Sequence, residues 1–319
     1  YMKIQDSIMT NNLIIGVTTI AFSKNQKLVG QLTKMGFKKV IINSKGIRLT
    51  QAELILFLSE CDVAIVGLDK IDKYVLSQLP KLKVISKYGV GLDNINFKDC
   101  NNFSTQVLYS QGVNKRSVSE MTLGFMLSLS RNLYKSSNLV KNGIWKKDGG
   151  MQLSEKKVGV IGIGNIGKDL ISLLKPFNCE ILVNDIIDQK EYYDKYNLRE
   201  VTKDYIFKNA DFITFHTPLN DSTKNILNKK SLSIMKPSSF VINTARAGII
   251  NQNDLKWALK NEIIAGAAID VYDIEPVQDK DLTMISSLIN TPHIGGNAIE
   301  AVEAMGQSAI NNIVNHFNS

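Results

Sequence analysis

The chain has three histidines, and each is a candidate for carrying a proton near neutral pH. His293 follows a proline and stands two positions before a pair of glycines, which predicts a sharp exit from a strand into a loop that presents its side chain. His216 ends the apolar run 212–215, where it could line a cofactor crevice or simply stabilise the end of a strand. His316 lies in a polar C-terminal stretch and is expected on the surface. His293 is therefore the first candidate for a general acid or base.

Two further charged residues stand at similar exits. Arg246 follows the apolar run 241–245 and precedes Ala247-Gly248, and Glu275 follows the run 267–274 and precedes a proline. Taken singly, each is typical of a surface charge. Together with His293 they lie at the ends of apolar strands of one predicted sheet, which favours a shared site.

A glycine fingerprint predicts a dinucleotide site. The apolar segment 157–161 leads into Gly162-Ile163-Gly164-Asn165-Ile166-Gly167, followed by a predicted helix over 168–175 that Pro176 stops. The first glycine permits a tight turn, the second lets the backbone approach a pyrophosphate, and the third allows helix and strand to pack closely. Free amides at the helix start would then face the phosphates. The alternative is a glycine turn with no ligand.

The choice between NAD and NADP rests on Asp185. The strand 180–184 ends in this residue, 18 positions after Gly167, which is close to the expected separation. A carboxylate there can accept hydrogen bonds from the ribose hydroxyls and would repel a 2′-phosphate. The residues that follow, Ile186 and Ile187, include no arginine to bind such a phosphate. The sequence therefore predicts NAD.

The elements that position these residues alternate between short apolar runs and helix-like stretches. This alternation predicts an α/β fold with two doubly wound parallel-sheet domains. Capping boxes predict helices beginning at Thr50 and at Ser117, and an amphipathic helix is expected over 299–317. The predicted strands span residues 13–18, 40–43, 63–67, 83–86, 104–108, 157–161, 181–184, 212–215, 240–243 and 265–269.

Length and composition limit the remaining possibilities. The 319 residues fit two domains, and the 44% hydrophobic and 21% charged content is typical of a soluble globular protein. The net charge of +8 is spread over scattered lysines, so no nucleic-acid partner is predicted, and no apolar run is long enough for a membrane span. Three widely spaced cysteines argue against disulfides or a metal site and favour the cytoplasm. Tyr1 precedes Met2, which we expect to be the natural start.

Several motifs, in this order along almost the whole chain, resemble the D-isomer-specific 2-hydroxyacid dehydrogenase family. The resemblance is strongest to its short phosphoglycerate dehydrogenase branch without a regulatory domain. The motifs are the glycine fingerprint, His216-Thr217-Pro218-Leu219, Met235-Lys236-Pro237, Asn243-Thr244-Ala245-Arg246, Gly266-Ala267-Ala268-Ile269-Asp270-Val271, Glu275-Pro276 and Thr291-Pro292-His293-Ile294-Gly295.

The resemblance implies a role for each matching residue. His293 resembles the acid/base that protonates the substrate carbonyl oxygen, Glu275 its partner carboxylate, and Arg246 the residue that binds the substrate carboxylate and polarises the carbonyl. Asp270 resembles the residue that holds the nicotinamide carboxamide. The implied cofactor-binding set is Gly162, Gly164, Asn165, Ile166, Gly167, Asp185, His216, Thr217, Pro218, Thr244, Ala245 and Asp270.

In the N-terminal part of the chain, residues 87–95 resemble the family's substrate loop. Its glycines would let the backbone amides of Tyr88, Gly89, Val90 and Gly91 reach a substrate carboxylate. By resemblance, residues 1–114 and 294–319 form a flavodoxin-like substrate domain and 115–293 a Rossmann cofactor domain, with the active site in a cleft between them. The family also implies a homodimer with the helix after Ser117 near its interface. The implied substrate-binding set is Lys87, Tyr88, Gly89, Val90, Gly91, Asn94 and Arg246.

Substrate identity stays open between related reactions. Lys87 stands where the phosphoglycerate dehydrogenase branch often has a basic residue, so it could meet a substrate phosphate, or it could be a solvent-exposed lysine. Reduction of glyoxylate or hydroxypyruvate is the nearest alternative. Formate oxidation is disfavoured because formate dehydrogenases of this fold have glutamine where Glu275 stands. Phosphite oxidation is disfavoured because that branch has lysine where Val90 stands. A different class, an NAD-sensing corepressor that acts as a binding module, also resembles this family, and the retained Arg246, Glu275 and His293 favour an enzyme.

Overall fold

A computed structural model describes residues 11–318; residues 1–10 and 319, and with them the expected start at Met2, lie outside the described part. The chain divides into two compact units. Unit 1 comprises Tyr1–Asn114 and Asn297–Ser319, and unit 2 comprises Lys115–Gly296. The chain therefore leaves unit 1 once and returns to it at Asn297. The roles of the two units as substrate and cofactor domains remain a prediction.

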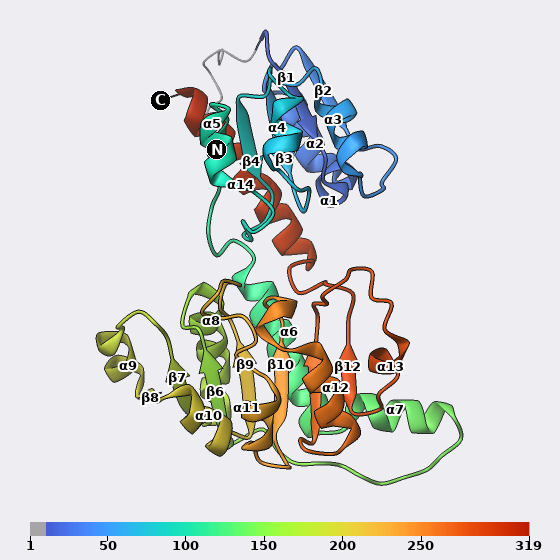
Figure 1. Cartoon of the computed structure of the whole chain (residues 1–319), viewed down its shortest axis with the longest axis vertical. Helices are drawn as coiled ribbons and strands as arrows, with labels where there is room; N and C mark the ends of the chain where they lie inside the picture. The colour runs from blue at the N-terminus through green and yellow to red at the C-terminus, as the bar shows by residue number, and fades with distance from the viewer. Residues whose placement is uncertain (1–10, 319) are drawn as a thin grey trace. The chain divides into compact units, whose positions relative to one another are not determined.

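Unit 1 contains a five-stranded parallel sheet in the order β2-β1-β3-β4-β5, which is the flavodoxin-like arrangement (Figure 1). Helices cover both faces. Its elements are β1 (Ile14–Val17), α1 (Ile20–Lys24), α2 (Gln26–Thr33), β2 (Lys39–Ile42), α3 (Gln51–Leu58), β3 (Val63–Val66), α4 (Lys73–Ser77), β4 (Val84–Lys87), α5 (Phe97–Asn102), β5 (Gln106–Leu108) and α14 (Ile299–Asn318).

The last helix, α14, completes the core of unit 1. Its buried residues pack in one cluster with side chains of β1, α1 and α2, on one face of the sheet. The Ser86 hydroxyl on β4 donates to the carbonyl of Ala309, at 2.9 Å. Gly306 lies so close to α2 that an added Cβ would come within 2.1 Å of the Leu28 side chain. A helix at the far end of the chain is therefore an integral part of the first sheet's packing.

Unit 2 contains a seven-stranded parallel sheet in the order β12-β11-β10-β9-β6-β7-β8, which has the Rossmann strand order. Its elements are α6 (Lys115–Ser130), α7 (Leu133–Lys141), β6 (Lys157–Ile161), α8 (Asn165–Leu174), a 3₁₀ turn (Lys175–Phe177), β7 (Glu180–Asn184), α9 (Lys190–Tyr196), β8 (Arg199–Glu200), α10 (Lys203–Asn209), β9 (Phe212–Phe215), α11 (Lys229–Ser233), β10 (Phe240–Asn243), a 3₁₀ turn (Ala247–Ile249), α12 (Gln252–Lys260), β11 (Gly266–Ile269), α13 (Lys280–Thr283) and β12 (Leu288–Asn290).

Two apolar clusters hold this sheet between its helices. One cluster joins the sheet to α6 and α8, and the other joins it to α10, α11 and α12. Asn132 has a left-handed backbone, with φ of 50°, so α6 and α7 are two separate helices on either side of it. The following helix α7 has no buried residue and extends away from the sheet in Figure 1.

The structure corrects three expectations about these elements. Ser117 does not cap a helix, because α6 begins at Lys115 and the Ser117 hydroxyl donates to the Gly295 carbonyl at 2.6 Å. The helix after the glycine loop starts at Asn165 rather than Lys168. The short strands β8 and β12 were not expected. The capping box at Thr50 and Glu53 is confirmed, with both reciprocal hydrogen bonds present.

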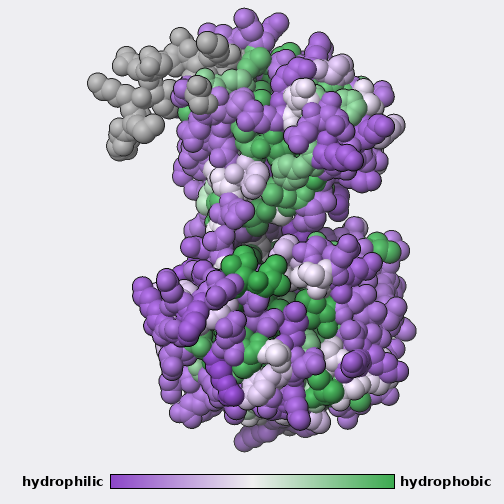
Figure 2. Space-filling model, turned by 60° about the vertical axis from the view of Figure 1, so that its left-hand side comes forward, coloured by the Kyte–Doolittle hydropathy of each residue, from purple (hydrophilic) through white to green (hydrophobic). Residues whose placement is uncertain are grey.

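The surface carries mostly polar residues on the face drawn in Figure 2. Among residues 11–318, no helix combines the length and the apolar character that a membrane crossing requires. Cys61 and Cys100 are buried and Cys179 is half-buried, and all three are free thiols.

Candidate active site

The glycine loop joins β6 to α8 at the carboxyl edge of the unit 2 sheet. Gly162 has φ of 97°, and a Cβ there would lie 2.6 Å from the His216 carbonyl oxygen. A Cβ on Gly167 would lie 2.2 Å from the Gly162 carbonyl oxygen. Gly164, in contrast, faces open space and caps α8 with no side-chain hydrogen bond. The first amides of α8 are therefore open to an anion, as the predicted cofactor site requires.

Asp185, directly after β7, contacts this loop. Its Oδ2 accepts a hydrogen bond from the Ile163 amide at 2.5 Å, and its Oδ1 accepts one from the Ile187 amide at 3.0 Å. The Gln189 side chain donates to the Ile163 carbonyl at 3.1 Å. The carboxylate predicted to read the ribose thus also fixes the middle of the glycine loop, a role that the sequence pattern did not suggest.

His216 and Thr217 follow β9 beside the same loop. His216 as a residue is half-buried, but its ring is shielded: Nε2 lies 3.0 Å from the Thr214 hydroxyl, and burial lowers the pKa of His216 to about 3. The ring is therefore neutral near neutral pH, which does not suit a proton donor. Its Nδ1 and the Thr217 Oγ1 are buried without a partner among residues 11–318. Such atoms are rare and fit a polar ligand at this edge.

His293 and Glu275 are in direct contact. The Nδ1 of His293 donates to the Glu275 carboxylate, with distances of 3.0 Å to Oε1 and 2.9 Å to Oε2. Their side chains are 35% and 27% exposed, so the pair is accessible yet partly shielded. The Tyr272 amide donates to Glu275 Oε1 at 3.2 Å and helps to orient the carboxylate. With Nδ1 engaged in this way, Nε2 is the nitrogen that can exchange a proton with a substrate.

Asp270 fixes the loop that carries His293. Its side chain is 1% exposed, and its Oδ1 accepts hydrogen bonds from the Thr291 hydroxyl at 2.6 Å and from the Ile294 amide at 2.9 Å. Its Oδ2 accepts one from the Gly295 amide at 2.7 Å. His293 itself has φ of 54°, an uncommon conformation for a residue other than glycine. The predicted contact of Asp270 with a nicotinamide carboxamide stays a prediction, whereas its role in holding the His293 loop is visible.

Arg246 follows β10, the strand that pairs with β11 in the sheet. It is half-buried, its Nη1 donates to the Ala245 carbonyl at 2.7 Å, and its own carbonyl accepts from the Asn243 side chain at 2.9 Å. Parallel strands end at the same edge of a sheet, so Arg246 shares that edge with Asp270. The neighbouring Thr244 is turned towards α6, where its hydroxyl lies 3.0 Å from that of Thr122.

In unit 1, the predicted substrate loop follows β4. Lys87 is 3% exposed, so the expectation of a solvent-exposed lysine is wrong. The Tyr88 amide was expected to be available to a carboxylate, but it donates to the Val66 carbonyl at 2.9 Å. In the described chain, the amides of Gly89, Val90 and Gly91 make no hydrogen bond within the protein. Three amides rather than four are therefore open to a ligand.

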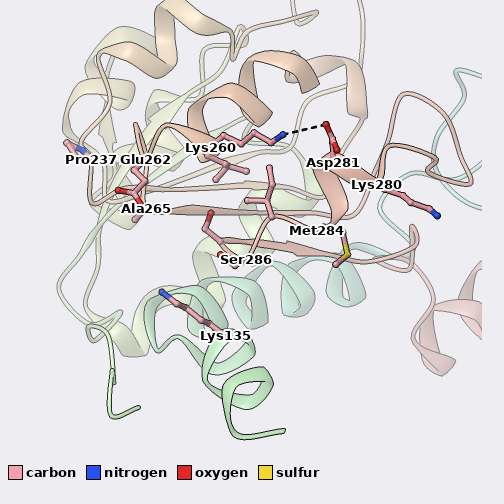
Figure 3. Close-up of a pocket in the computed structure, with 12 residues that line it drawn as sticks. Lys135, Pro237, Lys260, Glu262, Ala265, Lys280, Asp281, Met284 and Ser286 are labelled. Atoms are coloured by element: carbon pink, nitrogen blue, oxygen red, sulfur yellow. Dashed lines mark ion pairs between the residues drawn. The ribbon is translucent and has the colours of Figure 1, made fainter. Parts of the chain in front are cut away.

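A separate cavity of about 830 Å³ lies at the opposite edge of the unit 2 sheet. Figure 3 shows it between Lys135 on α7 and the α12–α13 region, where Lys260 and Asp281 form an ion pair of 3.5 Å. Its lining includes Ala265 and Ser287, which directly precede β11 and β12. Doubly wound sheets bind their ligands beyond the carboxyl ends of the strands. The edge with His293, and not this cavity, is therefore the candidate active site.

Comparisons with known proteins identify the family to which this chain is similar. The family model for the D-isomer specific 2-hydroxyacid dehydrogenase, NAD binding domain, matches residues 123–295. The D-3-phosphoglycerate dehydrogenase of Methanocaldococcus jannaschii is 35% identical over 262 residues, which cover 81% of this chain and 50% of that protein. The hydroxypyruvate reductase of Thermotoga maritima is 31% identical and covers 91% of this chain and 95% of its own.

A solved structure extends the similarity to the fold. The TT0316 protein of Thermus thermophilus superposes with a TM-score of 0.86 and 25% identity, over 95% of this chain and 96% of its own. The chain thus spans nearly all of the hydroxypyruvate reductase but about half of the phosphoglycerate dehydrogenase.

Proposed function

The chain belongs to the D-isomer specific 2-hydroxyacid dehydrogenase family, and we propose that it catalyses the reversible oxidation of the CH–OH group at carbon 2 of a small D-2-hydroxy acid. The observation that carries this proposal is the contact between His293 Nδ1 and the Glu275 carboxylate. A histidine oriented by a carboxylate, with its second nitrogen open, is suited to exchange a proton with a hydroxyl or carbonyl oxygen.

The division of work between residues follows from their chemistry. NAD, when bound, supplies or accepts the hydride. In reduction, His293 Nε2 gives its proton to the carbonyl oxygen, and Glu275 stabilises the imidazolium that holds that proton beforehand. Arg246 binds the substrate carboxylate through two parallel hydrogen bonds, which fixes carbon 2 for attack. The Gly89, Val90 and Gly91 amides of unit 1 are hydrogen-bond donors of the kind that bind a carboxylate.

The residues that would hold NAD surround the carboxyl edge of the unit 2 sheet. Gly164 and the first amides of α8 suit a pyrophosphate, and Asp185 suits the ribose hydroxyls. Within the described residues, Nδ1 of His216 and Oγ1 of Thr217 have no hydrogen-bond partner, and a bound nucleotide can provide one for each. Asn165, Ile166, Pro218, Thr244, Ala245 and Asp270 complete the proposed set.

For the substrate, we favour 3-phosphoglycerate or a close analogue. A phosphoglycerate dehydrogenase is among the relatives above 30% identity, and the same is true of a hydroxypyruvate reductase and of the glyoxylate reductase of Thermococcus litoralis. Reduction of hydroxypyruvate or glyoxylate is therefore the second candidate. An NAD-sensing corepressor-like module remains the candidate of another class.

A substrate panel separates these candidates. NADH oxidation is followed at 340 nm with phosphohydroxypyruvate, hydroxypyruvate, glyoxylate and pyruvate at equal concentrations, and binding of NADH is measured separately. We expect turnover with at least one acid and the highest kcat/KM with phosphohydroxypyruvate. A preference for glyoxylate selects the second candidate. NADH binding without turnover on any acid would contradict the enzyme and support the binding module.

We also propose that the enzyme is a cytoplasmic homodimer. The free thiols of its three cysteines suit a reducing compartment. The helix α7 and the segment after it expose Leu133, Val140, Ile144 and Trp145, with 54%, 55%, 50% and 79% of each residue accessible. Large apolar side chains grouped on a helix that buries nothing support a surface that a second copy covers.

A further inference from the structure

Lys87 is the last residue of β4, at the carboxyl edge of the unit 1 sheet, and its side chain is buried. Lysine is rarely buried unless its ammonium group finds hydrogen-bond partners, because removing a charge from water is costly. Resting on the function proposed above, we propose that Lys87 is a positioning residue that fixes the substrate loop through Asn94 and makes no contact with a substrate phosphate.

The Lys87 ammonium joins two loops of unit 1. Its Nζ donates to the carbonyl of Gly67, just after β3, and to Asn94 Oδ1 at 2.8 Å. The Asn94 amide nitrogen in turn donates to the same Gly67 carbonyl at 3.1 Å and to the Asp69 carbonyl at 2.6 Å. Lys87 and Asn94 therefore hold each other and the loop after β3 in one network.

This network anchors both ends of the substrate loop. At its start, the Tyr88 amide donates to the Val66 carbonyl at 2.9 Å. At its end, the Ile71 amide donates to the Asn94 carbonyl at 2.8 Å, and the Asn96 amide donates to the Ile71 carbonyl at 2.9 Å. Between these anchors lie Gly89, Val90 and Gly91, whose amides are open to a ligand. The direction of those amides thus depends on where Lys87 and Asn94 hold the loop.

The same contacts argue against a phosphate at Lys87. An ammonium group has three donors, and two of those of Lys87 point to oxygen atoms inside unit 1. Turning Nζ towards a ligand would leave the Asn94 Oδ1 without this donor. The carboxylate of Asp69 lies in the same network, where Oδ2 accepts from the Thr18 hydroxyl at 2.5 Å and from the Gly67 amide at 3.2 Å. The half-buried Asp69 carboxylate therefore belongs to the loop after β3 that the Lys87 ammonium contacts.

The test compares Lys87→Met and Asn94→Ala with wild type, using phosphohydroxypyruvate, hydroxypyruvate and glyoxylate. Loss of a charged hydrogen bond that orients the loop should raise KM about tenfold, by the same factor for all three acids, in both variants. Values of kcat should change less than KM, and the dissociation constant of NADH should not change. The double variant should have a KM no higher than that of the more impaired single variant, because the two residues act together.

Lys83→Met is the matched control. Lys83 lies directly before β4 but is exposed, and its Nζ donates only to the Pro80 carbonyl at 3.1 Å in the described chain. It should keep the wild-type KM for every acid. Circular dichroism and urea unfolding of each variant check its fold, and Asn94→Ala alone carries the comparison if Lys87→Met does not fold.

Two results would overturn the inference while leaving the proposed function intact. A loss confined to phosphohydroxypyruvate would mean that Lys87 contacts the phosphate. An unchanged KM for all three acids would mean that the network does not orient the loop. Wild-type protein with no turnover on any acid would instead contradict the proposed function, and this inference with it.

Discussion

At the scale of single residues, the location of one proton governs the proposed chemistry. Glu275 accepts from Nδ1 of His293, which leaves Nε2 for the substrate and ties the histidine to one orientation. Asp270 adds a second constraint, because its carboxylate accepts hydrogen bonds from residues on both sides of His293. The acid/base is thus held through its ring and through its backbone.

Replacing His293 tests this arrangement. His293→Ala should lower kcat about a hundredfold to ten-thousandfold, since it removes the general acid. The affinity for NADH, measured by fluorescence titration, should stay close to wild type. His316→Ala is the control histidine, because it lies in α14 of unit 1, and it should retain full turnover. A His293→Ala enzyme with wild-type kcat would remove this residue from the mechanism.

Sequence patterns indicated which residues form the candidate site but not how each is held. His293 and Glu275 stand beside a proline in recognisable motifs, and the structure brings them together. The hydrogen-bond partners of Lys87 and Asp270 could not be predicted in this way. Gly67 lies 20 residues from Lys87, and Gly295 lies 25 residues from Asp270, so each contact exists only after the sheet has formed. No local spacing rule reports such a pair.

At the scale of elements, one buried carboxylate joins α6 to α8. Asp169 on α8 is 9% exposed; its Oδ1 accepts from Arg116 Nη2 at 3.0 Å, and its Oδ2 accepts from the Ser119 hydroxyl. Both donors lie in the first turns of α6. Since α8 begins at the glycine loop, this contact also holds the start of the proposed cofactor-binding helix.

Asp169→Ala should destabilise unit 2 by about 1–3 kcal/mol, because the buried Ser119 hydroxyl and the Arg116 guanidinium lose this carboxylate as an acceptor. Urea unfolding followed by tryptophan fluorescence reports on this unit, since Trp145 and Trp257 both lie in it. Asp194→Ala removes an exposed pair with Lys190 and should leave the midpoint almost unchanged. Equal midpoints for both variants would contradict a structural role for Asp169.

The main elements follow from local sequence, and the exceptions have physical reasons. Buried parallel strands require continuous apolar runs, so segments such as 157–161, 212–215 and 240–243 could be located to the residue. The edge strand β8 has only two residues, both exposed, and the edge strand β12 has only three, of which Leu288 is buried. Both strands are too short to form a pattern. The Ser117 motif failed because its hydroxyl bonds to a distant carbonyl instead of its own helix.

At the scale of the whole molecule, the exposed apolar side chains of α7 and of the segment after it predict a homodimer that buries them. Light scattering of wild type at micromolar concentration should give twice the mass of one chain. Trp145→Ser combined with Val140→Ser should weaken the dimer by at least about tenfold, because large apolar anchors dominate such interfaces. Leu56→Ser, equally exposed but on α3 of unit 1, should not change the mass. A single-chain mass for wild type would contradict the dimer.

The return of α14 to unit 1 bears on how the protein is made. During translation the five strands of unit 1 leave the ribosome first, but the helix that covers Leu28 and Ser86 follows only after all of unit 2. At ordinary synthesis rates this delay is on the order of ten seconds. Unit 2 is continuous and can fold as it emerges, whereas the nascent first sheet must wait with part of one apolar face uncovered, because α1 and α2 cover only the rest of that face. Chaperones that bind such faces would find their main target in this interval.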